Sequence, residues 1–165
     1  MQVSQTTQAL LDAVREHQRQ TKRSGQPPLD PNQAGALRER VFSTFRYELP
    51  QAYLDLLNVT DGLDLNGIQF YASTPKQGVN DYFLPGLLEA NMQLRLGYEP
   101  AKNYVFFAES GMDAYRHNLR ENTFEISDRG AEDSVFERFE TADELFQQML
   151  NYMLGNYPDD EEDPA

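Results

Sequence analysis

The sequence contains no cysteine. Disulfide scaffolds, thiol nucleophiles, iron–sulfur clusters and cysteine-type zinc sites are therefore excluded. The 165 residues must instead be held together by an apolar core, to which 10 Phe and 9 Tyr can contribute. A chain of this length is typical of one domain.

Motifs for catalysis and for metal or phosphate binding are also missing. His17 and His117 are the two histidines, and we expect His117 to be an exposed strand residue. No serine stands in a Gly-x-Ser-x-Gly elbow, and no glycine-rich phosphate loop occurs. Aligning Asn66 and Gly67 with a calcium loop puts Gly62 and Ser73 where carboxylates are required, so a turn between a helix and a strand explains this stretch better. We predict no catalytic residue, no metal and no cofactor.

Long apolar runs are absent as well. No stretch approaches the about 20 apolar residues that a membrane-spanning helix needs. The segment from Met1 to Leu11 is polar and lacks the basic start of a targeting signal. We therefore expect a cytoplasmic protein without a membrane segment.

Positive charge is scarce: 14 Lys and Arg stand against 27 Asp and Glu, which gives a net charge of −13. This charge argues against nucleic acids and anionic membranes as partners, because both would repel it. Residues 1–48 carry +2 and the remainder carries −15. We divide the chain into an N-terminal helix or arm (1–28), a main domain (29–157) and an acidic disordered tail (158–165).

The apolar pattern changes its period along the chain. Apolar residues with helical spacing follow Asp30, follow Leu49 and extend from Leu84 to Leu96, so each of these stretches is predicted to be a helix. A capping box at Thr141 predicts the start of a last helix. Alternation predicts the strands 67–73, 104–108, 112–119, 123–128 and 135–139, joined largely by short turns. The fold class predicted is α+β: an antiparallel sheet of about four to six strands with helices packed on one side.

The expected strands carry many acidic residues and several tyrosines, and we expect part of this sheet to face solvent. Such a surface suits a basic protein partner, although an ordinary solvated sheet face has about equal weight on charge alone. The candidate partner-binding residues are Asp61, Asp64, Glu109, Asp113, Tyr115, Glu125 and Asp128.

Four segments resemble the SMI1/KNR4 (SUKH) superfamily. The stretch Leu49–Gly62 is similar to its helix with the pattern LP-x-x-Y-x-x-x-L-x-x-x-N/D-G. Gly67–Tyr71 is similar to the first strand of the family, and Tyr104–Gly111 is similar to its hydrophobic strand that ends at a glycine. Thr141–Leu150 is similar to the closing helix of the family. The resemblance as a whole covers about residues 31 to 155.

The resemblance implies an α+β domain without catalytic activity. Bacterial members of the superfamily are immunity proteins that neutralise polymorphic toxins, often nucleases, and fungal members are linked to control of cell-wall synthesis. The expected partner is therefore a basic protein, with a nuclease-type toxin domain as the first candidate. A regulatory module of the same fold without a toxin partner is the second interpretation. An enzyme acting on a small molecule or a sugar is the third, because 27 acidic residues allow many carboxylate pairs.

Overall fold

The computed structural model describes residues 3–21, 25–78, 82–131 and 133–157. The acidic tail proposed for 158–165 lies outside these residues. The helices are α1 (Gln5–Gln20), α2 (Pro31–Phe45), α3 (Gln51–Leu57), α4 (Leu87–Gly97), the 3-10 helix η1 (Glu99–Asn103) and α5 (Ala142–Met153). The strands are β1 (Leu63–Leu65), β2 (Ile68–Phe70), β3 (Lys76–Gln77), β4 (Phe83–Leu84), β5 (Tyr104–Glu109), β6 (Asp113–Asn118), β7 (Thr123–Asp128) and β8 (Val135–Phe139).

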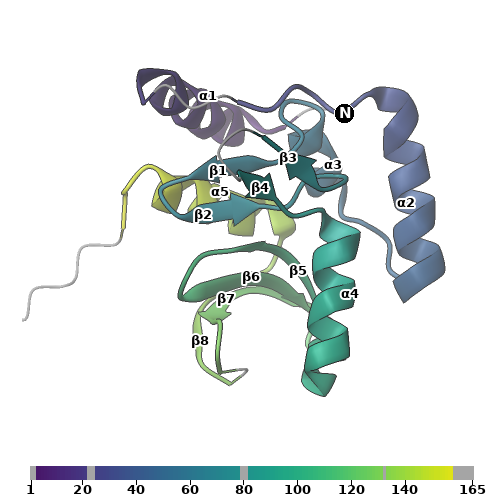
Figure 1. Cartoon of the computed structure of the whole chain (residues 1–165). Helices are drawn as coiled ribbons and strands as arrows, with labels where there is room; N and C mark the ends of the chain where they lie inside the picture. Colours follow the sequence, from purple (N-terminus) through teal and green to yellow (C-terminus); the bar gives the residue numbers. More distant parts are fainter. Residues whose placement is uncertain (1–2, 22–24, 79–81, 132, 158–165) are drawn as a thin grey trace, which may run out of the picture.

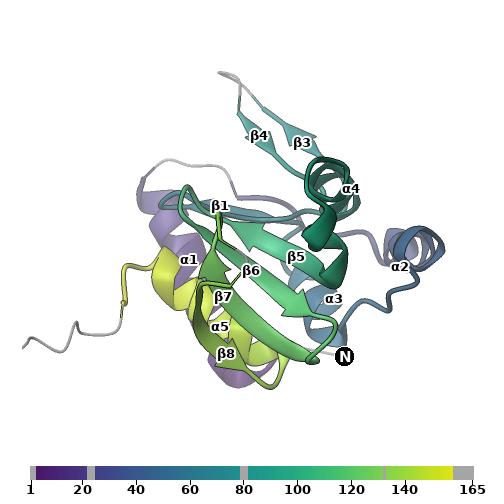
Figure 2. The same cartoon turned by 90° about the horizontal axis from the view of Figure 1, so that it is seen from below.

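The main sheet has six antiparallel strands in the order β1-β2-β5-β6-β7-β8, and β3 and β4 form a separate hairpin. This arrangement confirms the predicted α+β class. Figures 1 and 2 show α1 and α5 on one side of the sheet and α4 beside β5, with the β3–β4 hairpin projecting past α4.

An aromatic cluster holds the sheet to the helices on one face. Phe107 of β5 packs edge-on against Phe146 of α5, with ring centroids 5.4 Å apart, and Tyr53 of α3 contacts Phe70, Phe107 and Phe146. Such pairs add about 0.5–1.5 kcal/mol each beyond their buried area. The hydroxyl of Tyr53 donates to the carbonyl of Tyr71 at 2.7 Å, so this buried polar group has a partner.

The N-terminal helix α1 packs against α5. Leu11 and Val14 are fully buried in the same core as the rest of the chain. At the start of α1, the hydroxyl of Thr7 donates to Asp143 of α5 at 2.8 Å. Within the described residues, α1 is therefore part of the packed body.

The β1–β2 hairpin differs from the sequence prediction. The strand predicted over 67–73 is present only as the shorter β2, and the unpredicted strand β1 precedes it, joined to it by Asn66 and Gly67. Both linking residues have positive φ values, 53° and 83°. A two-residue Asn-Gly link of this kind matches the right-handed twist of the strands it joins, and it accounts for the turn that superficially resembles a calcium loop.

Candidate functional site

Three of the seven candidate partner-binding residues are buried, and the expectation that they face solvent is wrong. The carboxylate of Asp61 accepts hydrogen bonds from the backbone N–H of Ser73 at 2.7 Å and from its hydroxyl at 2.8 Å. It also pairs with the ammonium of Lys76 at 2.9 Å. Asp61 therefore holds the chain that follows β2, because its oxygens are used inside the protein.

Tyr115 faces α5. It is fully buried, and burial raises the pKa of its hydroxyl well above the usual value. Its strand neighbours alternate in direction, so Tyr115 lies on the core face of β6 while Ala114 and Arg116 lie on the opposite face.

Glu125 is buried on that opposite face, inside a polar network. One of its oxygens accepts from the Arg116 guanidinium at 2.9 Å, and the other accepts from the Asn118 amide at 3.1 Å and lies 3.5 Å from Nε of Arg138. The Arg116 guanidinium also lies over the ring of Tyr104, 3.8 Å from its centroid. Glu125 is therefore committed to neighbours within the sheet.

The other four candidates are half-buried and lie at one end of the sheet. Directly opposed residues of antiparallel strands share a face, and the register places Asp64 opposite Gln69 and Gln69 opposite Glu109. Asp113 and Asp128 oppose each other on the other face of the same end. Partial burial, with the nearby charge of Asp128, raises the pKa of the Asp113 carboxyl.

A groove runs between α4 and the sheet, on the face that carries Glu109. We call it the α4 groove. It consists of two adjoining hollows of about 280 and 230 Å³ that share Tyr71, Leu94, Glu109 and Arg129. Its aromatic lining comprises Tyr71, Phe83, Tyr98, Tyr104 and Phe106. A third hollow, which contains Asp64 and Gln69, meets the groove at Glu109 and Arg129.

Asn91 positions the α4 wall of this groove. Its side chain accepts from the backbone N–H of Phe106 at 2.8 Å and donates to the carbonyl of Phe106 at 2.9 Å. Arg95 donates to the carbonyl of Tyr104 at 2.9 Å. These side chains supply the hydrogen bonds that a further strand would make, because the backbone pairing along this edge of β5 ends with the bond from the Tyr71 N–H to the carbonyl of Phe107.

The predicted apolar face of this helix is partly wrong. Leu87 is buried, but Leu96 is 88% exposed and Met92 is 45% exposed, whereas the polar Asn91 is buried. The helix also starts at Leu87, since Phe83 and Leu84 form β4. The reason is that α4 borders the edge of a strand, where backbone groups need polar partners.

His117 is half-buried and packed, which corrects the expectation of an exposed strand histidine. Its ring stacks on Phe124 with centroids 4.1 Å apart, and its nitrogens bond the Tyr47 hydroxyl at 2.7 Å and the Asn122 side chain at 2.9 Å. Burial lowers the pKa of the imidazole. Among the residues that the structure describes, no group of three or more His, Asp or Glu is placed to hold a metal ion.

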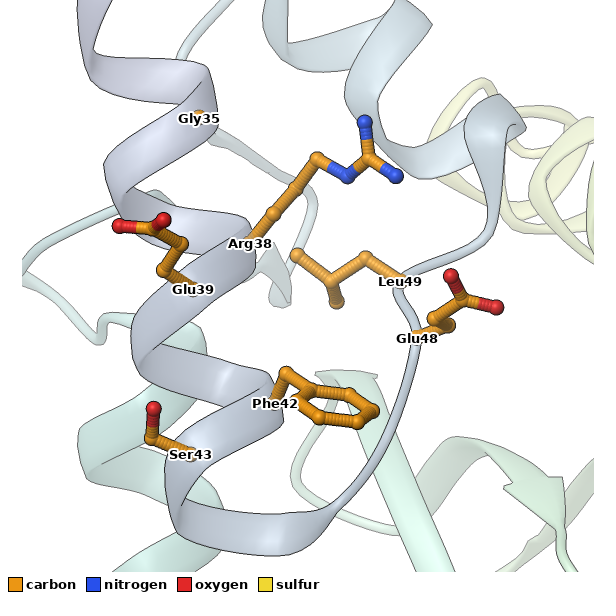
Figure 3. Close-up of a pocket in the computed structure, with 7 residues that line it drawn as sticks. All are labelled: Gly35, Arg38, Glu39, Phe42, Ser43, Glu48 and Leu49. Carbon is orange, nitrogen blue, oxygen red and sulfur yellow. The ribbon is translucent and has the colours of Figure 1, made fainter.

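A further open hollow of about 710 Å³ lies between α2 and the segment 46–50 (Figure 3). Phe42 and Leu49 point into it and Arg38 reaches across its upper end, whereas Glu39 and Ser43 point away. It contains none of the seven candidate residues.

Neither family models nor curated proteins give a match to this sequence. Across the described part of the chain, none of the helices is both long and apolar enough to cross a membrane.

Proposed function

We propose that this protein is a non-catalytic binding domain that recognises a basic protein through the acidic end of its sheet. The observation that carries the proposal is the convergence of Asp64, Glu109, Asp113 and Asp128 at that end. The α4 groove opens beside Asp64 and Glu109, on one face of that end. Acidic groups around an aromatic hollow combine charge steering with anchoring positions for partner side chains.

We further propose that the partner is a nuclease-type toxin domain and that the protein acts as an immunity protein. A nuclease needs a basic surface to hold phosphates, and an acidic protein can occupy that surface. The net charge of −13 and the resemblance to the SMI1/KNR4 superfamily support this interpretation. A regulatory module of the same fold is the alternative, and the genes beside the coding sequence distinguish the two.

Exposed apolar residues near the acidic end strengthen the case for a protein partner. Tyr98 and Phe83 line the groove and are about half exposed. Met112, in the turn between β5 and β6, is exposed more fully. Side chains of this type supply most of the affinity where they become buried at the centre of an interface.

The test measures binding of the toxin domain encoded beside the gene, by calorimetry at 50 and 300 mM NaCl. The double variant Asp64→Lys/Asp113→Lys reverses two charges at the acidic end. We expect it to bind at least about tenfold more weakly, because like charges would then face each other across the interface. Binding of the unaltered protein should weaken at the higher salt concentration.

The matched control is Glu121→Lys/Glu140→Lys, which makes the same change in net charge at the other end of the sheet. Both control residues are exposed. An equal loss of binding in the two double variants would contradict the assigned surface. Absence of binding by the unaltered protein at both salt concentrations would contradict the toxin proposal.

A further inference from the structure

Arg129 occupies the point where the three hollows at the acidic end meet. It belongs to the turn after β7, and its side chain reaches across to β5. Its guanidinium pairs with Glu109 at 2.8 Å and donates to the carbonyl of Ser110 at 3.1 Å. The side chain is 49% exposed, so the pair borders solvent. The Glu109 side chain is 21% exposed, and a partly exposed ion pair of this kind contributes only modestly to stability and can be exchanged for another.

The same face shows how this protein holds a guanidinium. Arg116 lies over the ring of Tyr104 and is paired with the carboxylate of Glu125, so an aromatic ring and a carboxylate together bind one arginine. Glu109 likewise shares the α4 groove with aromatic residues. Tyr71 lines both hollows of the groove beside Glu109, and Tyr98 and Phe106 line the larger one.

The charges around the groove favour a cation. Besides Glu109, the acidic residue Glu89 lines the smaller hollow, and Asp128, the last residue of β7, is among the residues that line the larger one. Of the two arginines that line it, Arg116 is neutralised by Glu125, which leaves Arg129 as the group that opposes the acids. If Arg129 turned away, an unpaired carboxylate beside aromatic rings would remain.

We propose that the α4 groove binds an arginine side chain of the protein partner, which displaces Arg129 from Glu109. This inference rests on the proposed function and specifies how the partner is recognised. A guanidinium suits the groove better than an ammonium, because it is planar, stacks on aromatic rings and forms forked hydrogen bonds with a carboxylate. Arg129 competes with the arginine of the partner for the carboxylate of Glu109.

The experiment titrates the ¹⁵N-labelled full chain with two blocked peptides, acetyl-Gly-Arg-Gly-amide and acetyl-Gly-Lys-Gly-amide, and follows the amide signals of Tyr71, Glu109 and Ala114. Arg129→Ala removes the competitor, and we expect it to bind the arginine peptide about two- to fivefold more tightly than the unaltered protein. Glu109→Gln should lose the binding, and the lysine peptide should bind more weakly to every form that binds.

Two controls match these charge changes away from the groove. Arg120→Ala and Glu121→Gln alter exposed residues of the turn between β6 and β7, and both should leave peptide affinity unchanged. The inference would be overturned if Arg129→Ala bound no more tightly than Arg120→Ala, if Glu109→Gln retained full binding, or if the two peptides bound equally. Unchanged amide spectra outside the groove show that the variants are folded.

The outcomes separate this inference from the proposed function. If the toxin domain binds and Glu109→Gln leaves its affinity unchanged, the arginine site is wrong while the acidic surface stands. If the arginine peptide binds as expected and the toxin domain does not, the groove stands and the toxin assignment fails.

Discussion

Arg116 and Glu125 form an ion pair within the sheet in which both side chains are at most 4% exposed. Removing one partner of such a pair leaves the other charge buried without compensation. Each group also has a second contact: Tyr104 lies beneath Arg116, and Asn118 donates to Glu125. The pair therefore ties β5, β6 and β7 together on the face of the α4 groove.

We expect Glu125→Ala to lower the free energy of unfolding by about 3–5 kcal/mol, because the Arg116 guanidinium would remain buried without the carboxylate of Glu125. Urea denaturation followed by circular dichroism measures the change. The double variant Arg116→Met/Glu125→Leu replaces both charges with apolar groups and should recover most of the loss. If the double variant were as unstable as Glu125→Ala, the loss of the carboxylate beside the Arg116 charge would not be the cause.

Asp113 gives a prediction about pH. Because the folded state raises the pKa of this carboxyl, the folded protein holds the proton more tightly than the unfolded chain does. Stability from this group is therefore present below the ordinary aspartate pKa of about 3.9 and is lost as pH rises through the raised value. The Asp113→Asn variant has an uncharged side chain at this position at every pH. It should therefore be more stable than the unaltered protein at pH 7 and no more stable at pH 3.

Urea midpoints at the two pH values test this expectation. Glu121→Gln removes one negative charge from an exposed turn and controls for the general effect of net charge. If both variants gained the same stability at pH 7, the local environment of Asp113 would not be the cause of the gain.

At the scale of the element, α4 depends on a polar residue rather than on its apolar stripe. We expect Asn91→Leu to lower the free energy of unfolding by about 2 kcal/mol or more, because the N–H and the carbonyl of Phe106 would lose their partner in a buried place. Leu96→Asn, the reverse exchange on the same helix, should change it by less than about 0.5 kcal/mol because Leu96 is exposed. Chemical denaturation measures both stability losses. If the apolar stripe held α4 in place, Leu96→Asn would instead lose more stability than Asn91→Leu.

Other elements show which signals in the sequence were sufficient. The capping box at Thr141 and the apolar face behind it predicted α5, and the structure has both halves of that box. Asn66-Gly67 is a hairpin signal, and the interpretation of this stretch as a turn between a helix and a strand does not use it. The β1–β2 pair was therefore missed, although two-residue Asn-Gly links are typical of hairpins.

At the scale of the whole molecule, the alternating pattern established the meander but not which strand faces stay accessible. Tyr115 and Glu125 belong to opposite faces of β6 and β7, and both are buried, one by α5 and the other within the polar network of the sheet. Alternation within one strand carries no information about what covers it. The turn at residues 119–122 sets a register that places Arg116 directly opposite Glu125, and this register predicts an ion pair between them.

The acidic end depends on the same long-range register. Asp64 and Glu109 are 45 positions apart in the sequence and meet only because β2 lies between β1 and β5. Composition predicted an acidic surface, but the positions of its carboxylates required the strand order. No sequence pattern indicates the α4 groove either, because its α4 wall is positioned by Asn91 and Arg95.

The contacts of Asn91 and Arg95 with β5 also bear on self-association. A strand edge with free N–H and carbonyl groups is a template on which another chain can form cross-strand hydrogen bonds and begin to aggregate. Along β5, beyond the end of β2, helix side chains already use the groups of Phe106 and Tyr104. A polar residue at the centre of α4 thus blocks one route by which an aromatic-rich sheet could extend into a neighbouring molecule.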